Sequence, residues 1–411
     1  GMSNTDKNIE NNCSQDLQNL RNATLATLTN YQKPDAYGAL SMPVYHCASY
    51  EFATAKEMSD VFCGRVQDPE YSRVMNPTVT FFENRVKLLT GAANVFAFNC
   101  GMSAISNVLF ALASQGKNIV TSSHLFGNTV SFLRNTLGPL GIESREINLL
   151  DREAVEKAVD ENTCAVFLEI ITNPQLEVAD VSMLAEVAHA KKVPVIADTT
   201  LIPFTQFDGK ALGIDAQVVS STKYISGGAT SLGGLVIDYG TFPIINRRIR
   251  YELLFNLGGY MTPHAAYMQT VGLETLDARY KVHASNALEL AKRLQTIPEI
   301  RRVNYTGLPD NPFYELAKKQ YGETSGAMLT IDLEDKESAL RFMNNLKVVH
   351  RASNLFDNRS LALHPASTIF GPFSGSQRRA MDVYDTTIRL SIGLENIDDI
   401  FNDIVQAVKN R

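Results

Sequence analysis

Cysteine is scarce in this sequence of 411 residues. The cysteines are Cys13, Cys47, Cys63, Cys100 and Cys164, and no two of them are spaced as C-x-x-C. Their odd number and wide spacing fit neither a disulfide framework nor a zinc site. Dispersed free thiols are typical of a reducing cytosol, so we expect a cytoplasmic protein without a metal centre.

Long apolar runs are also lacking. No stretch approaches the roughly 18 to 20 continuous apolar residues that a membrane helix needs. The N-terminal residues are polar and rich in amide side chains, without the apolar core of a secretory signal. Gly1 ahead of Met2 is interpreted as an expression remnant. We therefore expect a soluble protein with no membrane partner.

The sequence has no excess of positive charge, since it contains 38 Lys and Arg residues and 44 Asp and Glu residues, and the net charge is −6. No basic tail interrupts this balance, which argues against nucleic acid as a partner. No G-x-G-x-x-G loop follows a predicted strand, and no Walker-type glycine loop is present. Dinucleotide and nucleoside-triphosphate sites therefore lack their motifs.

The composition that remains is that of a folded globular protein, with 45% hydrophobic and 20% charged residues. The length favours two domains over a single core. We expect an N-terminal arm over 1–62 with a short helix near Gln15–Tyr31, a large α/β domain over 63–260, and a smaller α+β domain over 261–411.

Short β-rich runs alternate with helical stretches in the middle of the chain. Buried strands followed by amphipathic helices predict a mostly parallel sheet with both faces covered. The predicted strands are Asn94–Asn99, Asn118–Ser122, Glu143–Asn148, Cys164–Glu169, Val193–Asp198, Ala216–Ser220 and Gly234–Asp238. The C-terminal part predicts a long helical stretch from Met261 through Leu294, strands at Ala327–Leu333 and Thr387–Ile392, and a closing helix from Asn396.

Ligands of such sheets bind at the carboxyl ends of the strands, so the residues there are the candidates for a site. Gly101 follows a strand and precedes a helix that starts at about Ser103. Backbone N–H groups at that helix start could bind an anion, although an isolated glycine is equally explained as a tight turn.

Asp198 is the last residue of one predicted strand, and Lys223 lies three residues after the end of another. An Asp at this position could cap the next helix, or it could pair with the pyridinium nitrogen of pyridoxal 5′-phosphate (PLP). Most lysines are solvated, but Lys223 is flanked by small hydroxyl residues and glycines, and desolvation would make its amine a nucleophile. The hydroxyl groups of Ser220 and Thr222 could donate hydrogen bonds to the PLP phosphate, which the backbone N–H groups near Gly101 would also bind. The combination predicts PLP as a Schiff base on Lys223.

These residues carry a resemblance to a known family. The run Asp215-Ala-Gln-Val-Val-Ser-Ser-Thr-Lys-Tyr-Ile-Ser-Gly227 closely resembles the signature of the Cys/Met-metabolism PLP enzymes. That family contains cystathionine γ-synthase, the cystathionine lyases, methionine γ-lyase and the O-acylhomoserine sulfhydrylases. The resemblance extends from Pro43 to Glu395 and includes the motifs Tyr71–Thr78, Cys100–Ile105, Asn173-Pro174, Asp198–Thr200 and Thr387–Gly393. It implies the aspartate-aminotransferase-like fold, known as fold type I.

The resemblance also implies roles for the cofactor's phosphate and for assembly. The residues implied to hold the phosphate are Gly101, Met102, Ser220 and Thr222. Tyr71 and Arg73 are implied to reach that phosphate from a neighbouring subunit. We therefore expect at least a homodimer, with a homotetramer as the form most typical of the family.

Further implied roles concern the cofactor ring and the substrate. Phe126 occupies the ring-stacking position, Asn173 would contact the phenolic oxygen, and Asp198 the ring nitrogen. Arg389, with Ser353 nearby, would bind the substrate carboxylate, which suits a guanidinium fork; a surface arginine on a strand is the commoner alternative. No metal ligand is implied.

The stretches Ser353–Thr368 and Gly272–Leu276 look most like O-acetylhomoserine sulfhydrylases. The implied reaction replaces the γ-acyloxy group with sulfide and makes homocysteine, with Lys223 as the general base and a small thiol or a carrier protein as other possible sulfur donors. The alternatives are methionine γ-lyase, cystathionine γ-lyase and cystathionine γ-synthase, which share most of these residues. A homologue that binds PLP only for regulation is the alternative from another class.

Four residues depart from the family pattern. Phe126 stands where most relatives have Tyr, so it keeps a stacking surface and lacks a hydroxyl group. Gly228 and Phe370 stand where relatives often carry His, and Phe356 replaces a usual Gly. We expect Phe356 to narrow the substrate pocket.

Overall fold

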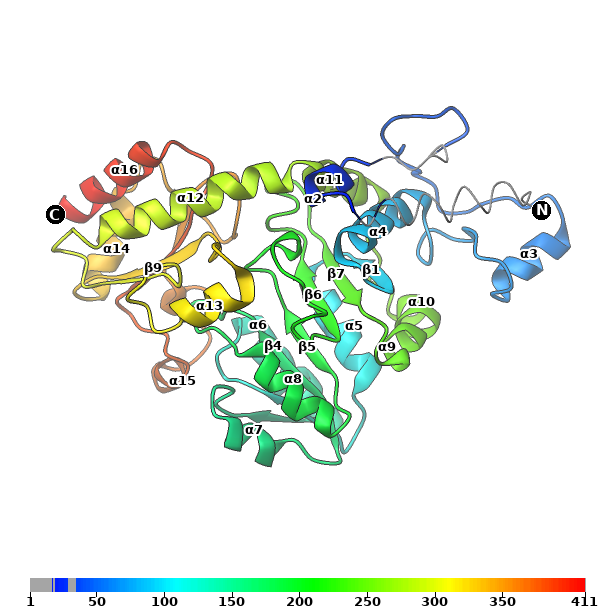
Figure 1. Cartoon of the computed structure of the whole chain (residues 1–411), viewed down its shortest axis with the longest axis horizontal. Coiled ribbons are helices and arrows are strands. Elements are labelled where there is room, and N and C mark those ends of the chain that lie inside the picture. Colours follow the sequence, from blue (N-terminus) through cyan, green and yellow to red (C-terminus); the bar gives the residue numbers. More distant parts are fainter. Residues whose placement is uncertain (1–16, 18, 29–34, 411) are drawn as a thin grey trace.

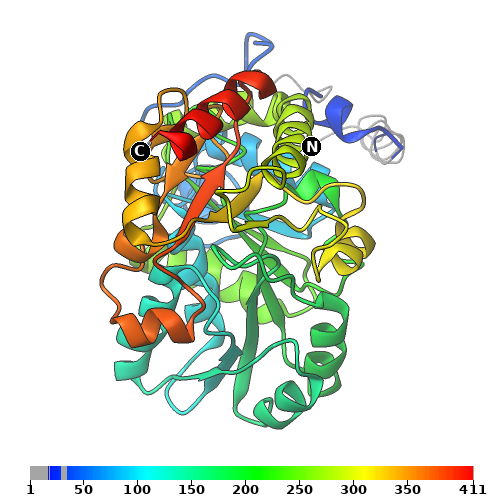
Figure 2. The same ribbon diagram turned by 90° about the vertical axis from the view of Figure 1, so that its left-hand side faces the viewer.

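The computed structural model describes residues 17, 19–28 and 35–410, which form two sheets with helices around them (Figure 1). Figure 2 shows the C-terminal part, yellow to red, lying above the central part, cyan to green. The predicted helix near Gln15–Tyr31 lies partly outside the described residues. Within that range the structure has helix α2 (Asn22–Leu25).

The central sheet contains all of the strands predicted for it, in the spatial order β1-β7-β6-β5-β4-β2-β3. Its strands are β1 (Asn94–Phe98), β2 (Asn118–Thr121), β3 (Glu143–Glu146), β4 (Thr163–Glu169), β5 (Val195–Asp198), β6 (Ala216–Ser220) and β7 (Gly234–Asp238). The strand β7 runs antiparallel to β1 and β6, and the other pairs are parallel. The prediction of a mostly parallel sheet is confirmed.

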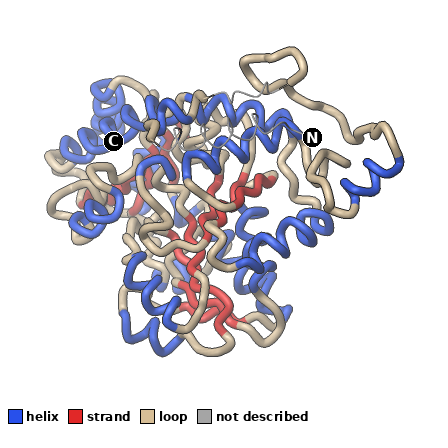
Figure 3. Tube along the Cα trace, turned by 45° about the vertical axis from the view of Figure 1, so that its right-hand side comes forward, coloured by secondary structure: helices blue, strands red, loops and turns tan. Residues whose placement is uncertain are grey.

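Both faces of the central sheet are buried, as the alternation along β4 shows. Val166 and Leu168 pack into one hydrophobic core, while Ala165 and Phe167 pack into another on the opposite face. Successive side chains of a strand point to opposite faces, so a strand that is apolar at every position needs cover on both sides. Figure 3 shows helices on both sides of the strands.

The helices of this part begin and end at recognisable signals. Helix α4 (Pro77–Thr90) has Asn76 as its N-cap, a proline in its first turn, and Gly91 in the left-handed region (φ 68°) after its last turn. The other helices here are α3 (Ala55–Phe62), α5 (Gly101–Leu112), α6 (Gly127–Ser131), α7 (Arg152–Ala158), α8 (Val181–Ala190), α9 (Pro243–Arg248) and α10 (Leu254–Leu257). Short π or 3-10 segments lie at Phe132–Leu137, Gly138–Leu140, Phe204–Gln206 and Ile249–Leu253.

The second sheet has the order β10-β11-β12-β9-β8. The strands predicted at Ala327–Leu333 and Thr387–Ile392 are β9 (Met328–Asp332) and β12 (Thr387–Ser391). The sequence analysis missed β8 (Arg302–Asn304), β10 (His350–Arg351) and β11 (Leu361–Leu363), because strands of two or three residues are too short to show an alternation. The helices are α13 (Tyr314–Tyr321), α14 (Lys336–Asn345), α15 (Gly375–Ala380) and α16 (Ile397–Lys409), with a 3-10 turn at Pro365–Ser367.

The helical stretch expected from Met261 through Leu294 is two helices, α11 (Pro263–Glu274) and α12 (Leu276–Leu294), so the expectation of one stretch is corrected. Thr275 separates them with φ −106° and ψ 4°. Both sides of Thr275 have a helical pattern, so the break leaves no signal in the sequence.

Among the described residues, no strand of either sheet crosses from the large domain proposed over 63–260 to the C-terminal domain proposed over 261–411, and the division stays a prediction. Among those residues no helix is long and apolar enough to span a membrane.

Candidate active site

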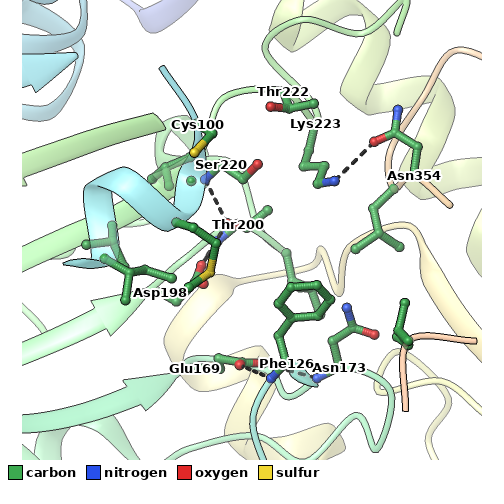
Figure 4. Close-up of a pocket in the computed structure, with 18 of the residues that line it drawn as sticks. Cys100, Phe126, Glu169, Asn173, Asp198, Thr200, Ser220, Thr222, Lys223 and Asn354 are labelled. Carbon is green, nitrogen blue, oxygen red and sulfur yellow. Dashed lines mark hydrogen bonds between the residues drawn. The ribbon is translucent and has the colours of Figure 1, made fainter. Parts of the chain in front are cut away.

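A pocket lies where the adjacent strands β4, β5 and β6 end, and the C-terminal part of the chain closes its other side (Figure 4). The predicted site residues that line it are Gly101, Met102, Phe126, Asn173, Asp198, Ser220, Thr222, Lys223, Ser353 and Arg389. The carboxyl ends of the strands therefore bring together residues that are far apart in the sequence, as expected for this type of sheet.

Lys223 follows β6 and points into the pocket (Figure 4). Its Nζ donates a hydrogen bond to Oδ1 of Asn354 at 3.1 Å. Burial lowers the pKa of Lys223 to about 8, the positive charge of Arg389 acts in the same direction, and the carboxylate of Asp198 opposes them. A useful fraction of the amine is therefore neutral and nucleophilic near neutral pH.

Asp198 is the last residue of β5, and Thr200 fixes its carboxyl group. Oδ1 of Asp198 accepts hydrogen bonds from the Thr200 amide at 3.1 Å and from the Thr200 hydroxyl at 2.7 Å. Burial raises the pKa of Asp198. Asp198 is not the N-cap of a described helix, so the alternative of a simple helix cap is wrong, and a cationic partner in the pocket would compensate the burial of this carboxylate.

Glu169 is a buried residue to which the sequence analysis assigned no role. It ends β4 beside Asp198, and its carboxylate accepts hydrogen bonds from the backbone N–H groups of Phe126 at 2.6 Å and Asn173 at 3.2 Å. Burial, and then the charge of Asp198, raise the pKa of Glu169 well above its usual value. Glu169 thus fixes the backbone of two predicted site residues. Its position at the end of a predicted strand was the signal in the sequence that could have identified it as a site residue.

The start of α5 and the turn after β6 form a cradle for an anion. Cys100 caps the helix, with its Sγ accepting from the Ser103 amide at 3.4 Å, and the first-turn N–H groups of a helix have no partner within it. Gly101 lies so close to Ser220 that a Cβ on it would be 3.0 Å from the Ser220 Cβ. The hydroxyl of Thr222 accepts from the Gly233 amide at 3.0 Å. The amides of the first turn and the hydroxyl groups of Ser220 and Thr222 would fit the phosphate group of PLP as hydrogen-bond donors.

Arg389 lies on β12 and is only 3% exposed. Its guanidinium donates to Oδ1 of Asn173 at 3.2 Å and to the carbonyl oxygen of Asn354 at 3.3 Å. Burial lowers the pKa of Arg389 to about 10, and no carboxylate among the described residues offsets it. A buried cation without an anionic partner is a receptor for a carboxylate. Ser353 lines the pocket, but its neighbour Asn354 makes the polar contacts.

Of the four departures from the family pattern, only Phe126 lines the pocket. Phe356 is fully buried, stacks on Tyr224 with ring centroids 4.0 Å apart, and has φ 57°. The expectation that Phe356 narrows the substrate pocket is therefore wrong, because its ring packs in the core. Phe370 is also fully buried, in a separate cluster, and Gly228 lies outside the pocket wall.

Tyr71 and Arg73 do not reach the pocket within one chain. Tyr71 is 40% exposed, and the guanidinium of Arg73 lies over its ring, 5.0 Å from the centroid. Arg73 lines a second hollow, together with Glu83, Arg250 and Tyr260. The predicted contact of Tyr71 and Arg73 with the cofactor therefore requires another subunit.

A mostly parallel α/β sheet with a desolvated lysine, a buried carboxylate and an anion cradle at its strand ends defines a PLP-dependent enzyme of fold type I. No group of three His, Cys, Asp or Glu side chains suited to a metal ion occurs in the described part of the chain. The chain belongs to the Cys/Met metabolism PLP-dependent enzyme family, whose model matches residues 23–409.

Individual relatives carry different activities within the family. The chain is 34% identical to an L-methionine gamma-lyase of Pseudomonas putida, over 94% of this chain and 97% of that protein. Among solved structures, a candidate O-acetylhomoserine (thiol)-lyase from Campylobacter jejuni, containing a pyridoxyl-lysine-monophosphate residue, has a TM-score of 0.91 and 32% identity, with 95% of this chain and 100% of that chain covered. An O-acetylhomoserine sulfhydrylase from Wolinella succinogenes has a TM-score of 0.74 and 42% identity, with 82% of this chain and 99% of that chain covered.

Proposed function

We propose that the protein replaces the γ-acetoxy group of O-acetylhomoserine with sulfide and so makes homocysteine and acetate. The observation that carries the proposal is the wall of the pocket around Phe126. Among the described residues of the same chain that line it, none is a tyrosine or a histidine, and both carboxyl oxygens of Glu169 face backbone amides. The Tyr71 that we propose to enter from a second subunit is assigned to the phosphate. Acetate leaves as a weakly basic anion and needs little protonation, whereas a thiolate leaving group needs an acid.

The relatives carry both activities, and the identities come from matches of different extent: 42% with the sulfhydrylase from Wolinella succinogenes over 82% of this chain, and 34% with the lyase from Pseudomonas putida over 94% of it. We therefore keep γ-elimination, as in methionine γ-lyase, as the second candidate.

The proposed roles follow from the geometry of the pocket. When bound, PLP supplies an electron sink for negative charge on the carbon beside the substrate amine. Asp198 would hold the ring nitrogen in its protonated state, Phe126 would cover the ring and exclude water, and Asn173 would contact the ring oxygen. The phosphate would be held by the first turn of α5 and by Ser220 and Thr222. We further propose that Tyr71 and Arg73 of a second subunit complete this phosphate site.

On the substrate side, Arg389 binds the α-carboxylate and thereby fixes the direction of the γ-carbon. Lys223, as a neutral amine, removes the α-proton and then a proton from the β-carbon, which its pKa of about 8 permits. Acetate departs from the γ-carbon, the sulfur of sulfide bonds to the same carbon, and protons return to the α- and β-carbons. The sulfur enters as free sulfide in this proposal, and a small thiol or a carrier protein would enter at the same carbon.

The test is product analysis with O-acetyl-, O-succinyl- and O-phosphohomoserine, each with and without sulfide. We expect homocysteine as the main product from O-acetylhomoserine with sulfide. Release of 2-oxobutanoate and ammonia as the main products in the presence of sulfide would contradict the proposal and favour the lyase.

A further inference from the structure

His124 joins three separate segments of the chain close to the pocket. It lies two residues before Phe126, on the loop after β2. Its Nδ1 is 2.7 Å from Oε2 of Glu177, on the segment that follows Asn173, and its Nε2 is 3.0 Å from Oδ2 of Asp382, in the C-terminal part of the chain. One imidazole ring therefore bridges the loops that carry Phe126 and Asn173 to a third segment more than 200 positions away.

That third segment, residues 369–383, borders the pocket through Ile369. Ile369 lines the pocket wall, and a Cβ on Gly127 would lie 2.8 Å from the Ile369 carbonyl oxygen, so the segment packs directly on the residue after Phe126. At its other end, the side-chain amide of Gln175 donates to the Met381 carbonyl oxygen at 2.7 Å. The segment is thus attached at both ends to loops and a helix start of the large domain, and His124 with Asp382 makes the attachment that involves charge.

We propose that His124 is a positioning residue that holds segment 369–383, and with it Ile369, against Phe126 at the mouth of the substrate site. Its contribution to turnover rests on the proposed function, because Ile369 lines the pocket assigned to O-acetylhomoserine. The attachment itself depends only on the geometry of the three segments.

The protonated ring is the form that makes both contacts. Both partners are carboxylates, which only accept, and a neutral imidazole has a single N–H group, so only the imidazolium donates to both. The charged and titratable groups that face the ring are Glu177 and Asp382, and the Tyr384 hydroxyl in turn donates to Asp382 at 2.6 Å. The hydrogen bond with Glu177, and more weakly the charge of Asp382, raise the pKa of His124.

The backbone conformation of Asp382 determines which substitution can test its pairing with His124. Its φ is 56°, in the left-handed region, where residues other than glycine are uncommon and Asp and Asn are better tolerated than most. Asp382→Asn keeps this backbone tolerance and the shape of the side chain, and it removes the negative charge. It is therefore a specific probe of the pairing with His124.

The experiment is amide hydrogen exchange on the PLP-loaded protein, comparing the wild type with Asp382→Asn and His124→Gln at matched pH. Each variant should speed the exchange of peptides within 369–383 by about threefold to fivefold at pH 6, the size expected for a partly exposed ion pair. The difference should shrink as the pH rises through the raised pKa of His124, because the second contact is lost in the wild type as well. Peptides from α8 should not change.

His189→Gln is the matched control, since His189 contacts Asp215 at 2.7 Å within the large sheet region and does not touch segment 369–383. It should leave exchange of that segment unchanged. In activity assays, Asp382→Asn should raise KM for O-acetylhomoserine several-fold with a smaller effect on kcat, and only below the pH at which His124 loses its proton. Unchanged exchange of 369–383 in both variants at pH 6 would overturn the inference. Accelerated exchange in a protein that makes no homocysteine would overturn the proposed function and leave the attachment standing.

Discussion

Lys223 illustrates how one residue's surroundings set its chemistry. Burial and the charge of Arg389 lower its pKa to about 8, so below that pH most of the amine is an ammonium group that cannot attack an aldehyde. We expect the rate at which the cofactor-free protein takes up PLP to rise about tenfold per pH unit up to about pH 8, and then to level off. Stopped-flow absorbance at the cofactor band measures this rate.

The cause of the shift can be tested at the same residue scale. Arg389→Gln removes the positive charge and should move the midpoint of that profile to higher pH, since a nearby cation disfavours the ammonium form. Lys223→Ala should show no cofactor band and no turnover while keeping its far-ultraviolet circular dichroism. A profile that is flat between pH 6 and pH 8 in the wild type would contradict the account.

Arg389 itself is predicted to act by geometry as well as by charge. Arg389→Lys keeps the charge and loses the planar fork, so KM for O-acetylhomoserine should rise by about one to two orders of magnitude with a smaller fall in kcat. Steady-state kinetics measure both. An unchanged KM would place the substrate carboxylate elsewhere. Arg359→Lys, at a half-exposed arginine that pairs with Asp357 outside the pocket wall, is the control and should leave KM unchanged.

The sequence predicted most of these residues because they belong to motifs at strand ends. It did not assign roles to Glu169, Thr200 or Asn354. These residues act in the site through hydrogen bonds to other site residues. Such contacts depend on the pairing of β4, β5 and β6 and on the packing of the C-terminal part, and neither leaves a periodic pattern. The error at Phe356 has the same origin, since only the structure shows that the ring turns toward Tyr224.

At the scale of elements, helix α11 lies very close to the turn that carries Lys223. A Cβ on Gly272 would lie 1.9 Å from the carbonyl oxygen of Ile225, so the helix can approach only because this residue has no side chain. Gly272→Ala should destabilise the protein by about 1–3 kcal/mol and reduce activity, as overpacking does. Val271→Ala, at a position 46% exposed, is the control and should stay within about 0.5 kcal/mol.

Urea unfolding curves measure both variants, and equal midpoints would refute the close approach.

The same elements show the limits of prediction. The central strands were predictable because their apolar runs are buried on both faces. The break at Thr275 and the short strands β8, β10 and β11 were not, because their boundaries are set by packing and not by a local pattern.

At the scale of the whole molecule, a single chain leaves the phosphate site without Tyr71 and Arg73. We expect Arg73→Ala and Lys223→Ala to be inactive alone, and mixed dimers of the two to regain part of the activity, because one of their two sites is then fully wild type. Activity of co-expressed, separately tagged subunits measures this. Verified mixed dimers without activity would argue against a shared site.

The central claim is that the pocket favours replacement at the γ-carbon over elimination. The most direct test compares two rates on one preparation: homocysteine formation from O-acetylhomoserine with sulfide, and 2-oxobutanoate release from methionine. A missing general acid costs about 10²–10⁴-fold in rate, and a carboxylate leaving group tolerates that loss far better than a thiolate. The account predicts that the first rate exceeds the second by at least about 10²-fold, and that Phe126→Tyr narrows the gap by raising the second. Faster 2-oxobutanoate release from methionine by the unmodified protein would contradict it.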